Sequence, residues 1–197
     1  MAQKLKSHME TVGNVVGLNV KVVITDGAQP VGRGIGPTLE AIDILKVLKN
    51  EADAPKDLVE RALFLAGELL ELSGKVGNGK GIEIAQQILE SGKAYEKFFA
   101  ICKAQGRFTE PILAPYAIDI KAEKSGILER IDNRKIAKLA KLSGAPQSKL
   151  AGILLNTHLG EKIEENQLLY TIYAESKGEL NYALEYKNYH NDILIIT

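Results

Sequence analysis

The chain has 197 residues, and its 25 basic side chains balance its 25 acidic ones. A neutral chain with no Lys/Arg cluster and no Trp gives no reason to expect nucleic acid as a partner. No apolar run approaches the ~20 residues that cross a bilayer, and no signal-peptide core is present. Cys102 is the only cysteine, which excludes an intramolecular disulfide and fits a reducing compartment. We therefore expect a cytoplasmic protein of one or two domains without a membrane partner.

The first part of the chain predicts a helix, a strand, a loop and a second helix. Apolar residues recur on one side of residues 2–16, and Gly17 ends that helical pattern. The β-branched run Val20–Ile24 is long enough for a buried strand. Apolar positions at helical spacing then predict a helix over Leu39–Leu48.

The loop between this strand and this helix is rich in glycine and proline. Pro30 stiffens the loop, and Pro37 suits the first turn of the following helix. The residues that permit unusual backbone angles are Gly27, Gly32, Gly34 and Gly36. Such a loop at the carboxyl end of a strand lets the backbone approach a ligand or an ion, although a tight connection without a ligand explains it equally well.

The remainder of the first half is expected to be helical. Helices are predicted over residues 55–72, 82–92 and 94–104. One strand in ~110 residues is far below the strand content of a free-standing α/β domain. Residues 1–113 are therefore predicted to be the trailing part of an α/β domain whose other strands are mostly not encoded here.

The pattern changes near Pro111 and Pro115, where we place a domain boundary. Short apolar runs alternate with turns, one of them at residues 160–163, and two helices are expected over residues 133–143 and 178–186. The predicted strands are Ala117–Ala122, Ile127–Ile131, Ile153–Leu155, Leu168–Ala174 and Ile193–Ile196. Their short connections favour antiparallel pairing, so residues 117–197 are predicted to form a small α+β domain.

Several familiar motifs fail in this sequence. The segment Gly74–Gly81 begins like a phosphate-binding P-loop, but Gly81 stands where Ser or Thr belongs and a helix precedes it. The loop glycines depart from the dinucleotide-binding spacing. Neither the three histidines nor Cys102 forms a metal-binding or catalytic set by spacing.

Two carboxylates follow the glycine loop in the sequence. Glu40 and Asp43 lie three residues apart on the predicted helix, so both face roughly the same side, back toward the glycines. Loop carbonyls and one carboxylate would form an oxygen-lined cage for a hard cation. The alternative is that both acids only stabilise the positive end of the helix dipole.

The segment Thr25–Ala41, T-D-G-A-Q-P-V-G-R-G-I-G-P-T-L-E-A, resembles the signature of the thymidine and pyrimidine-nucleoside phosphorylase family, in the branch that includes AMP phosphorylases. Residues Ile131–Ala137, Ser143–Pro146, Ala151–Ile153 and Leu169–Ser176 are similar to the C-terminal domain of that family. The resemblance covers essentially the whole chain. The family's phosphate-binding loop and its base-binding residues have no counterpart here, so the chain resembles only the C-terminal part of such an enzyme.

The resemblance implies phosphorolysis, in which thymidine and phosphate give thymine and 2-deoxyribose 1-phosphate. AMP phosphorylase is the alternative within the family, and a non-catalytic structural, oligomerisation or carrier-like domain is the alternative from another class. Nucleoside and phosphate would bind the full-length protein, expected to be a homo-oligomer such as a dimer. The isolated chain is expected to be inactive, since no catalytic or substrate-binding residue can be assigned in it.

The family also implies a cation site in the glycine loop. No organic cofactor is expected, but a monovalent cation such as potassium would lie between this loop and the family's phosphate-binding loop. Its ligands from this chain would be the carbonyls of Val31 and Gly34 and the side chain of Asp43. Asp43 stands where the family often has Glu.

Overall fold

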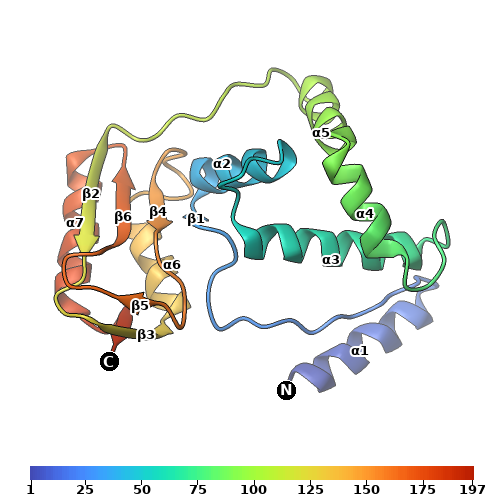
Figure 1. Cartoon of the computed structure of the whole chain (residues 1–197), viewed down its shortest axis with the longest axis horizontal. Helices are drawn as coiled ribbons and strands as arrows, with labels where there is room; N and C mark the ends of the chain where they lie inside the picture. The colour runs from blue at the N-terminus through green and yellow to red at the C-terminus, as the bar shows by residue number, and fades with distance from the viewer.

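The computed structural model describes residues 1–197 and contains seven helices and seven strands (Figure 1). All the predicted helices are present, with ends that differ by a few residues from those expected. The longest is α3, whose leucines and alanines favour a helix and which ends before Gly74. The helices are α1 Ala2–Val15, α2 Pro37–Leu48, α3 Lys56–Leu72, α4 Gly81–Glu90, α5 Lys93–Ala104, α6 Asn133–Leu142 and α7 Lys177–Tyr189.

The strands form two antiparallel sheets. The larger sheet has the order β1-β4-β6-β2 and the smaller one the order β5-β3-β7. The strands are β1 Gly34–Ile35, β2 Tyr116–Lys121, β3 Gly126–Ile131, β4 Gly152–Leu155, β5 Lys162–Ile163, β6 Leu168–Ala174 and β7 Leu194–Ile196. This pairing confirms the expected α+β arrangement of mainly antiparallel strands in the second half of the chain.

The second half is organised around one apolar core. Sixteen buried residues between Ala122 and Ile193 form a single cluster, in which Ile153 of β4 lies opposite Ile172 of β6. Helices α6 and α7 pack against each other, α6 also against β4, and α7 also against β6 and β2. Both helices begin with a side-chain cap, since Asp132 accepts two backbone N–H groups and Ser176 accepts one.

One predicted turn is a strand in the structure. Lys162–Ile163, expected to lie in a turn, forms β5 and pairs with Gly126 and Ile127 of β3. The side chain of Ile163 is fully buried in the core of the second half. Burial of this single apolar side chain against β3 therefore outweighs the turn preference of the neighbouring residues.

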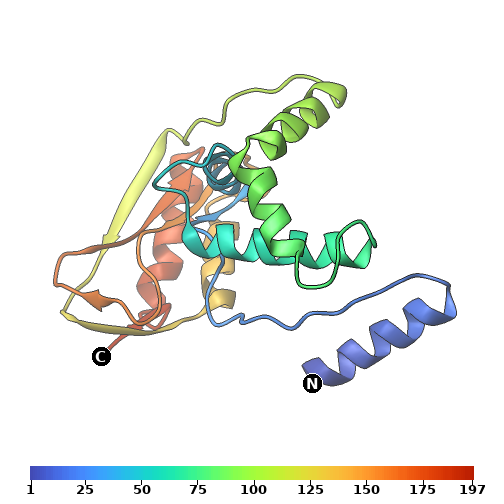
Figure 2. The same cartoon turned by 45° about the vertical axis from the view of Figure 1, so that its right-hand side comes forward.

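The first half has a looser arrangement. Helices α3, α4 and α5 follow one another, while α1 lies apart from them at the end of a long extended segment (Figure 2). The strand expected over Val20–Ile24 is not formed, because a strand needs a partner edge and none lies beside this segment. The segment is held by a hydrogen bond from the Val22 N–H to Glu10 Oε1 at 3.4 Å and by an ion pair between Lys21 and Glu68.

The only strand in the first half belongs to the sheet of the second half. β1 pairs with β4, so that Gly34 lies opposite Leu154 and Ile35 opposite Ile153. The two backbone segments approach closely here, because a Cβ on Gly36 would lie 2.4 Å from the Ala151 carbonyl oxygen. The glycine loop is thereby fixed at the edge of the larger sheet. No helix of the protein has the length and apolar character needed to cross a membrane.

Candidate functional site

The candidate site is the glycine loop, residues 26–36, which lies between the first turn of α3 and the end of β4 (Figure 1). A cavity of about 520 Å³ opens there. Its polar lining includes Gln29, Arg33 and Lys56 from the first half and Asn156, Thr157 and His158 from the second. A smaller cavity of about 310 Å³ lies on the other side of Pro30 and is bordered by Asp26, Val31 and Arg61.

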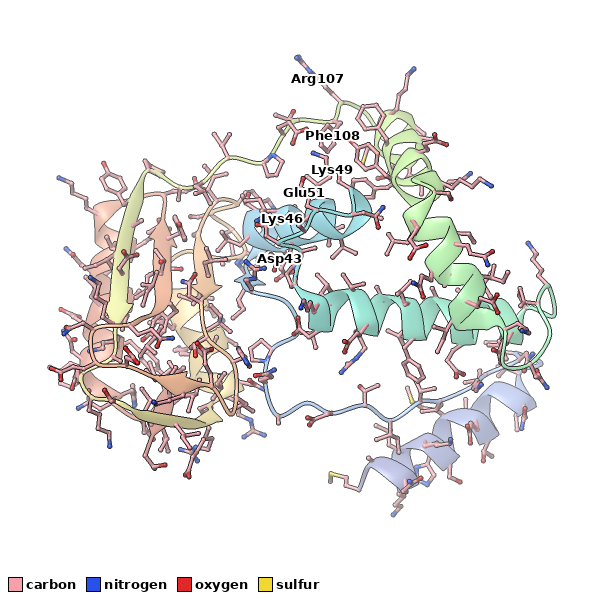
Figure 3. All side chains as sticks on the ribbon, in the orientation of Figure 1. Asp43, Lys46, Lys49, Glu51, Arg107 and Phe108 are labelled. Carbon is pink, nitrogen blue, oxygen red and sulfur yellow. The ribbon has the colours of Figure 1, made fainter.

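Asp43 is the central side chain of this loop. It is only 4% exposed, although carboxylates are seldom buried without partners. Its Oδ2 accepts the N–H groups of Arg33 and Gly34, each at 2.7 Å, which is typical of charge-assisted hydrogen bonds. Figure 3 shows Asp43 on α2, near β1 and far from Arg107 and Phe108 beyond α5. The carboxylate thus faces the glycine loop, as its position on the predicted helix indicates.

The close contact between α2 and the loop requires glycine at position 34. A Cβ on Gly34 would lie 2.3 Å from the Leu39 carbonyl carbon and 2.7 Å from the Glu40 nitrogen. Both atoms belong to the helix backbone, which cannot move aside as a flexible side chain could. Only a residue without a side chain allows α2 to begin directly beside β1 and to bring Asp43 to the loop.

Two further carboxylates hold N–H groups of the loop. The Gly32 N–H donates to Asp57 Oδ2 at 3.0 Å, and the Gly36 N–H donates to Glu40 Oε1 at 3.0 Å. Gly32 has φ +80°, a conformation that L side chains rarely adopt. With Asp43, these acids satisfy four successive or nearly successive amide groups, so negative charge lies behind the loop backbone.

Basic side chains complete the surroundings of the loop. The Arg33 guanidinium donates to the Asp53 carbonyl, and the Lys46 ammonium pairs with the Asp53 carboxylate. The hydrogen bond from Lys46 holds the pKa of Asp53 below its ordinary value. Arg61 of α3 donates to Thr25 Oγ1 at 2.9 Å and to the Asp26 carbonyl at 3.1 Å. The loop is therefore anchored on α3 as well as on α2.

The carbonyls predicted as cation ligands lie in this same loop. The Val31 carbonyl accepts no hydrogen bond from the chain. The Leu155 N–H donates to the Arg33 carbonyl, whereas the Arg33 N–H donates to Asp43 and not back to β4. The Gly34 N–H donates to the same Asp43 oxygen.

The second half matches a known protein domain. Residues 127–193 match the family model described as "Pyrimidine nucleoside phosphorylase C-terminal domain". This range contains β3 except Gly126, β4 to β6, both helices of the second half and nearly all of its core.

Curated relatives extend the similarity beyond residues 127–193 to the glycine loop and α1. A protein of Legionella pneumophila (strain Corby) named "Putative thymidine phosphorylase" is 55% identical over 196 residues, which are 100% of this chain and 38% of the relative. Proteins of the same name from Hahella chejuensis and Maricaulis maris are 51% and 49% identical over 98% and 94% of this chain, and over 39% and 36% of their own lengths. The chain thus spans about two fifths of the length of these relatives.

Asp43, Glu40 and the loop can be identified from the sequence, but Asp57, Gln29 and Asn133, which also fix the loop, cannot. Asp57 was visible only as an acid in the first turn of a helix, where it suits the helix dipole without any further role. Asn133 and Gln29 link the loop to the second half of the chain across 106 and 130 residues of sequence. No local pattern marks such distant partners.

Proposed function

We propose that this chain is the C-terminal part of a longer nucleoside phosphorylase, an enzyme that transfers the pentosyl group of thymidine to phosphate. The products would be thymine and 2-deoxyribose 1-phosphate. The observation that carries the proposal is the 55% identity, over the whole chain, to the Legionella pneumophila protein named "Putative thymidine phosphorylase". The match of residues 127–193 to the pyrimidine nucleoside phosphorylase C-terminal domain supports it. AMP remains the substrate to test against thymidine, since the Thr25–Ala41 segment also resembles AMP phosphorylases.

In phosphorolysis, phosphate attacks the anomeric carbon of the nucleoside while the bond to the base breaks. Positive charge develops on the sugar and negative charge on the base, so rate acceleration comes from positioning the phosphate and stabilising the leaving base. No residue of this chain is assigned to either task. Its proposed contribution is a rigid glycine loop at the edge of the phosphate site, held by Asp43 and Asp57.

We infer that the same loop would hold a monovalent cation such as potassium in the full-length enzyme. The ligands from this chain would be the carbonyls of Val31 and Gly34 and the carboxylate of Asp43. Three features support this assignment. Asp43 is buried against the loop, and its Oδ1 accepts no hydrogen bond. The Val31 carbonyl also accepts no hydrogen bond from the chain. Oxygen ligands of this kind suit hard cations, and a bound cation would supply positive charge beside the phosphate.

The activity test compares the full-length protein with the 197-residue chain. Each is incubated with phosphate and with thymidine, uridine or AMP, and the released base is quantified by chromatography. We expect phosphate-dependent release of thymine by the full-length protein and no release by the isolated chain. Preferred release of adenine from AMP would favour the AMP phosphorylase alternative. Absence of phosphorolysis with all three substrates in the full-length protein would refute the proposal.

The cation test replaces Asp43 in the full-length protein. Asp43→Asn keeps the size of the side chain but removes its charge, whereas Asp43→Ala removes both acceptor oxygens. We expect both variants to raise the potassium concentration needed for activity and the KM for phosphate together, by about tenfold or more, because loss of a charged hydrogen-bond acceptor is costly in a buried site. Glu51→Gln, just beyond α2, serves as the control. Unchanged potassium dependence in Asp43→Asn would favour a helix-dipole role alone.

A further inference from the structure

The glycine loop is held by the C-terminal domain at several points that the proposed reaction does not explain. Asn133 Nδ2, at the start of α6, donates to the Gly27 carbonyl at 2.8 Å. The Leu159 N–H, beyond β4, donates to Gln29 Oε1 at 2.8 Å. The Leu155 N–H donates to the Arg33 carbonyl at 2.8 Å. The second half thus contacts the beginning, middle and end of the loop.

The helix cap at the start of α6 fixes the position of Asn133. Asp132 caps α6 by accepting the N–H groups of Arg134 and Lys135, each at 3.1 Å, and this cap fixes the first helical residue, Asn133. The Asn133 Oδ1 is buried without a partner, an unfavourable arrangement for an amide. Only the Nδ2 group of this side chain is hydrogen-bonded, to the Gly27 carbonyl. The residue therefore contributes to the loop as a donor.

The two halves bind different groups of the loop. Carboxylates from α2 and α3 accept the N–H groups of Gly32, Arg33 and Gly34. Contacts from the second half hold the carbonyls of Gly27 and Arg33 and the side chain of Gln29. Val31 lies between these two sets of anchors and is fixed only through its neighbours. Its carbonyl direction therefore depends on both halves.

We propose that Gln29 and Asn133 are positioning residues through which the C-terminal domain sets the conformation of the glycine loop, and thereby the affinity of the enzyme for phosphate. The kinetic part of this inference rests on the proposed function. It gives the C-terminal domain a role in the reaction that acts through the loop. The domain acts as a support that keeps the loop carbonyls and Asp43 in register.

The first experiment measures amide hydrogen exchange of the loop in the 197-residue chain. Asn133→Asp replaces the donor Nδ2 group by a carboxylate oxygen and adds a negative charge, which suits the first turn of α6, so the helix should persist. Gln29→Met removes the acceptor at similar length, whereas Gln29→Glu retains it. We expect Gly32, Arg33 and Gly34 to exchange about three- to tenfold faster in Asn133→Asp and Gln29→Met, the effect of one lost hydrogen bond. Gln29→Glu and the exposed control Asn181→Asp should exchange like the unaltered chain.

The second experiment measures kinetics of the same variants in the full-length enzyme. The KM for phosphate should rise about three- to tenfold in Asn133→Asp and Gln29→Met with kcat changed less than about twofold, and Gln29→Glu should restore the KM. Unchanged loop exchange in the folded variants would overturn the mechanical link, whether or not the enzyme is a phosphorylase. Faster exchange with an unchanged KM in an active enzyme would overturn the positioning role. Absence of phosphorolysis in the unaltered enzyme would refute the proposed function, and loop exchange alone would then decide the link.

Discussion

The two halves of the chain differ in how much of their apolar surface they bury. The second half buries a core of sixteen residues, several of them fully inaccessible, and exposes only Ile127, Tyr182 and Tyr189 among its large apolar side chains. The other seventeen exposed large apolar side chains all lie between Met1 and Leu113. An apolar groove of about 460 Å³ also runs along α3 and α4, lined by eleven hydrophobic residues out of thirteen. Amphipathic spacing therefore identifies helices in both halves, but only the second half buries nearly all of its large apolar side chains.

The sharpest test of this difference is a pair of leucine truncations. Leu128 of β3 is fully buried in the core of the second half, whereas Leu69 of α3 is 65% exposed. Leu128→Ala should lower the free energy of unfolding by about 3–5 kcal/mol, since it removes buried methyl groups and leaves a cavity. Leu69→Ala should change it by less than about 0.5 kcal/mol. Denaturant titration followed by circular dichroism measures both, and equal effects would contradict the comparison.

A second pair tests the junction where the halves meet. Gly34→Ala places a methyl group against the backbone of Leu39 and Glu40, so α2 and β1 must separate. We expect a loss of about 1–3 kcal/mol in unfolding free energy, typical of overpacking at a site that cannot yield. Gly77→Ala is the matched control, because nothing lies within 4 Å of the added Cβ there. Thermal unfolding of both variants provides the measurement, and a Gly34→Ala variant as stable as Gly77→Ala would show that the junction is loosely packed.

The exposed apolar side chains of the first half should also drive self-association of the 197-residue chain. Large contiguous apolar patches promote association, and Leu65 and Leu69 lie one turn apart on α3. The double variant Leu65→Lys/Leu69→Lys should weaken association about tenfold or more, because each added charge would have to be buried in the contact. The control is Tyr182→Lys, which changes an exposed apolar residue of the second half. Sedimentation velocity over a concentration series measures the self-association of each variant. Equal effects of both changes would exclude the first half as the source of the self-association.

Sequence patterns predicted elements that are stabilised by their own neighbours. The strand Leu168–Ala174 has the predicted bounds, and α6 and α7 begin within a residue of the expected positions. Their alternating or helical spacing is realised in a core encoded by nearby residues. The Val20–Ile24 run has the composition of a strand, but pairing depends on a partner edge that the chain does not place beside it. Composition alone cannot reveal that partner.

The candidate site shows the same limit. The position of Asp43 facing the glycines follows from helical spacing, because the residues involved lie within one loop and the helix that follows it. The pairing of β1 with β4 could not be predicted, since a two-residue strand has no detectable period. The contacts of Asn133 and Gln29 join segments more than 100 residues apart, so only the folded chain brings them together. Whether the Val31 and Gly34 carbonyls bind a cation stays a prediction.

The smallest expected effect concerns the second glycine-rich loop of the first half, residues 74–81. Glu71 Oε1 accepts the N–H groups of Gly81 and Gly79, both at 2.9 Å, and these bonds hold the pKa of Glu71 below its ordinary value of 4.5. Because the pKa is lower in the folded state, the carboxylate contributes its full stabilisation above about pH 4.5 and loses it as the pH falls through the lower folded value. The amide resonances of Gly79 and Gly81 should therefore shift with a midpoint below pH 4.5, while that of Gly77 serves as an internal control. Glu71→Gln should abolish the transition, and a midpoint at or above pH 4.5 would show that the two amide bonds do not stabilise the charged carboxylate.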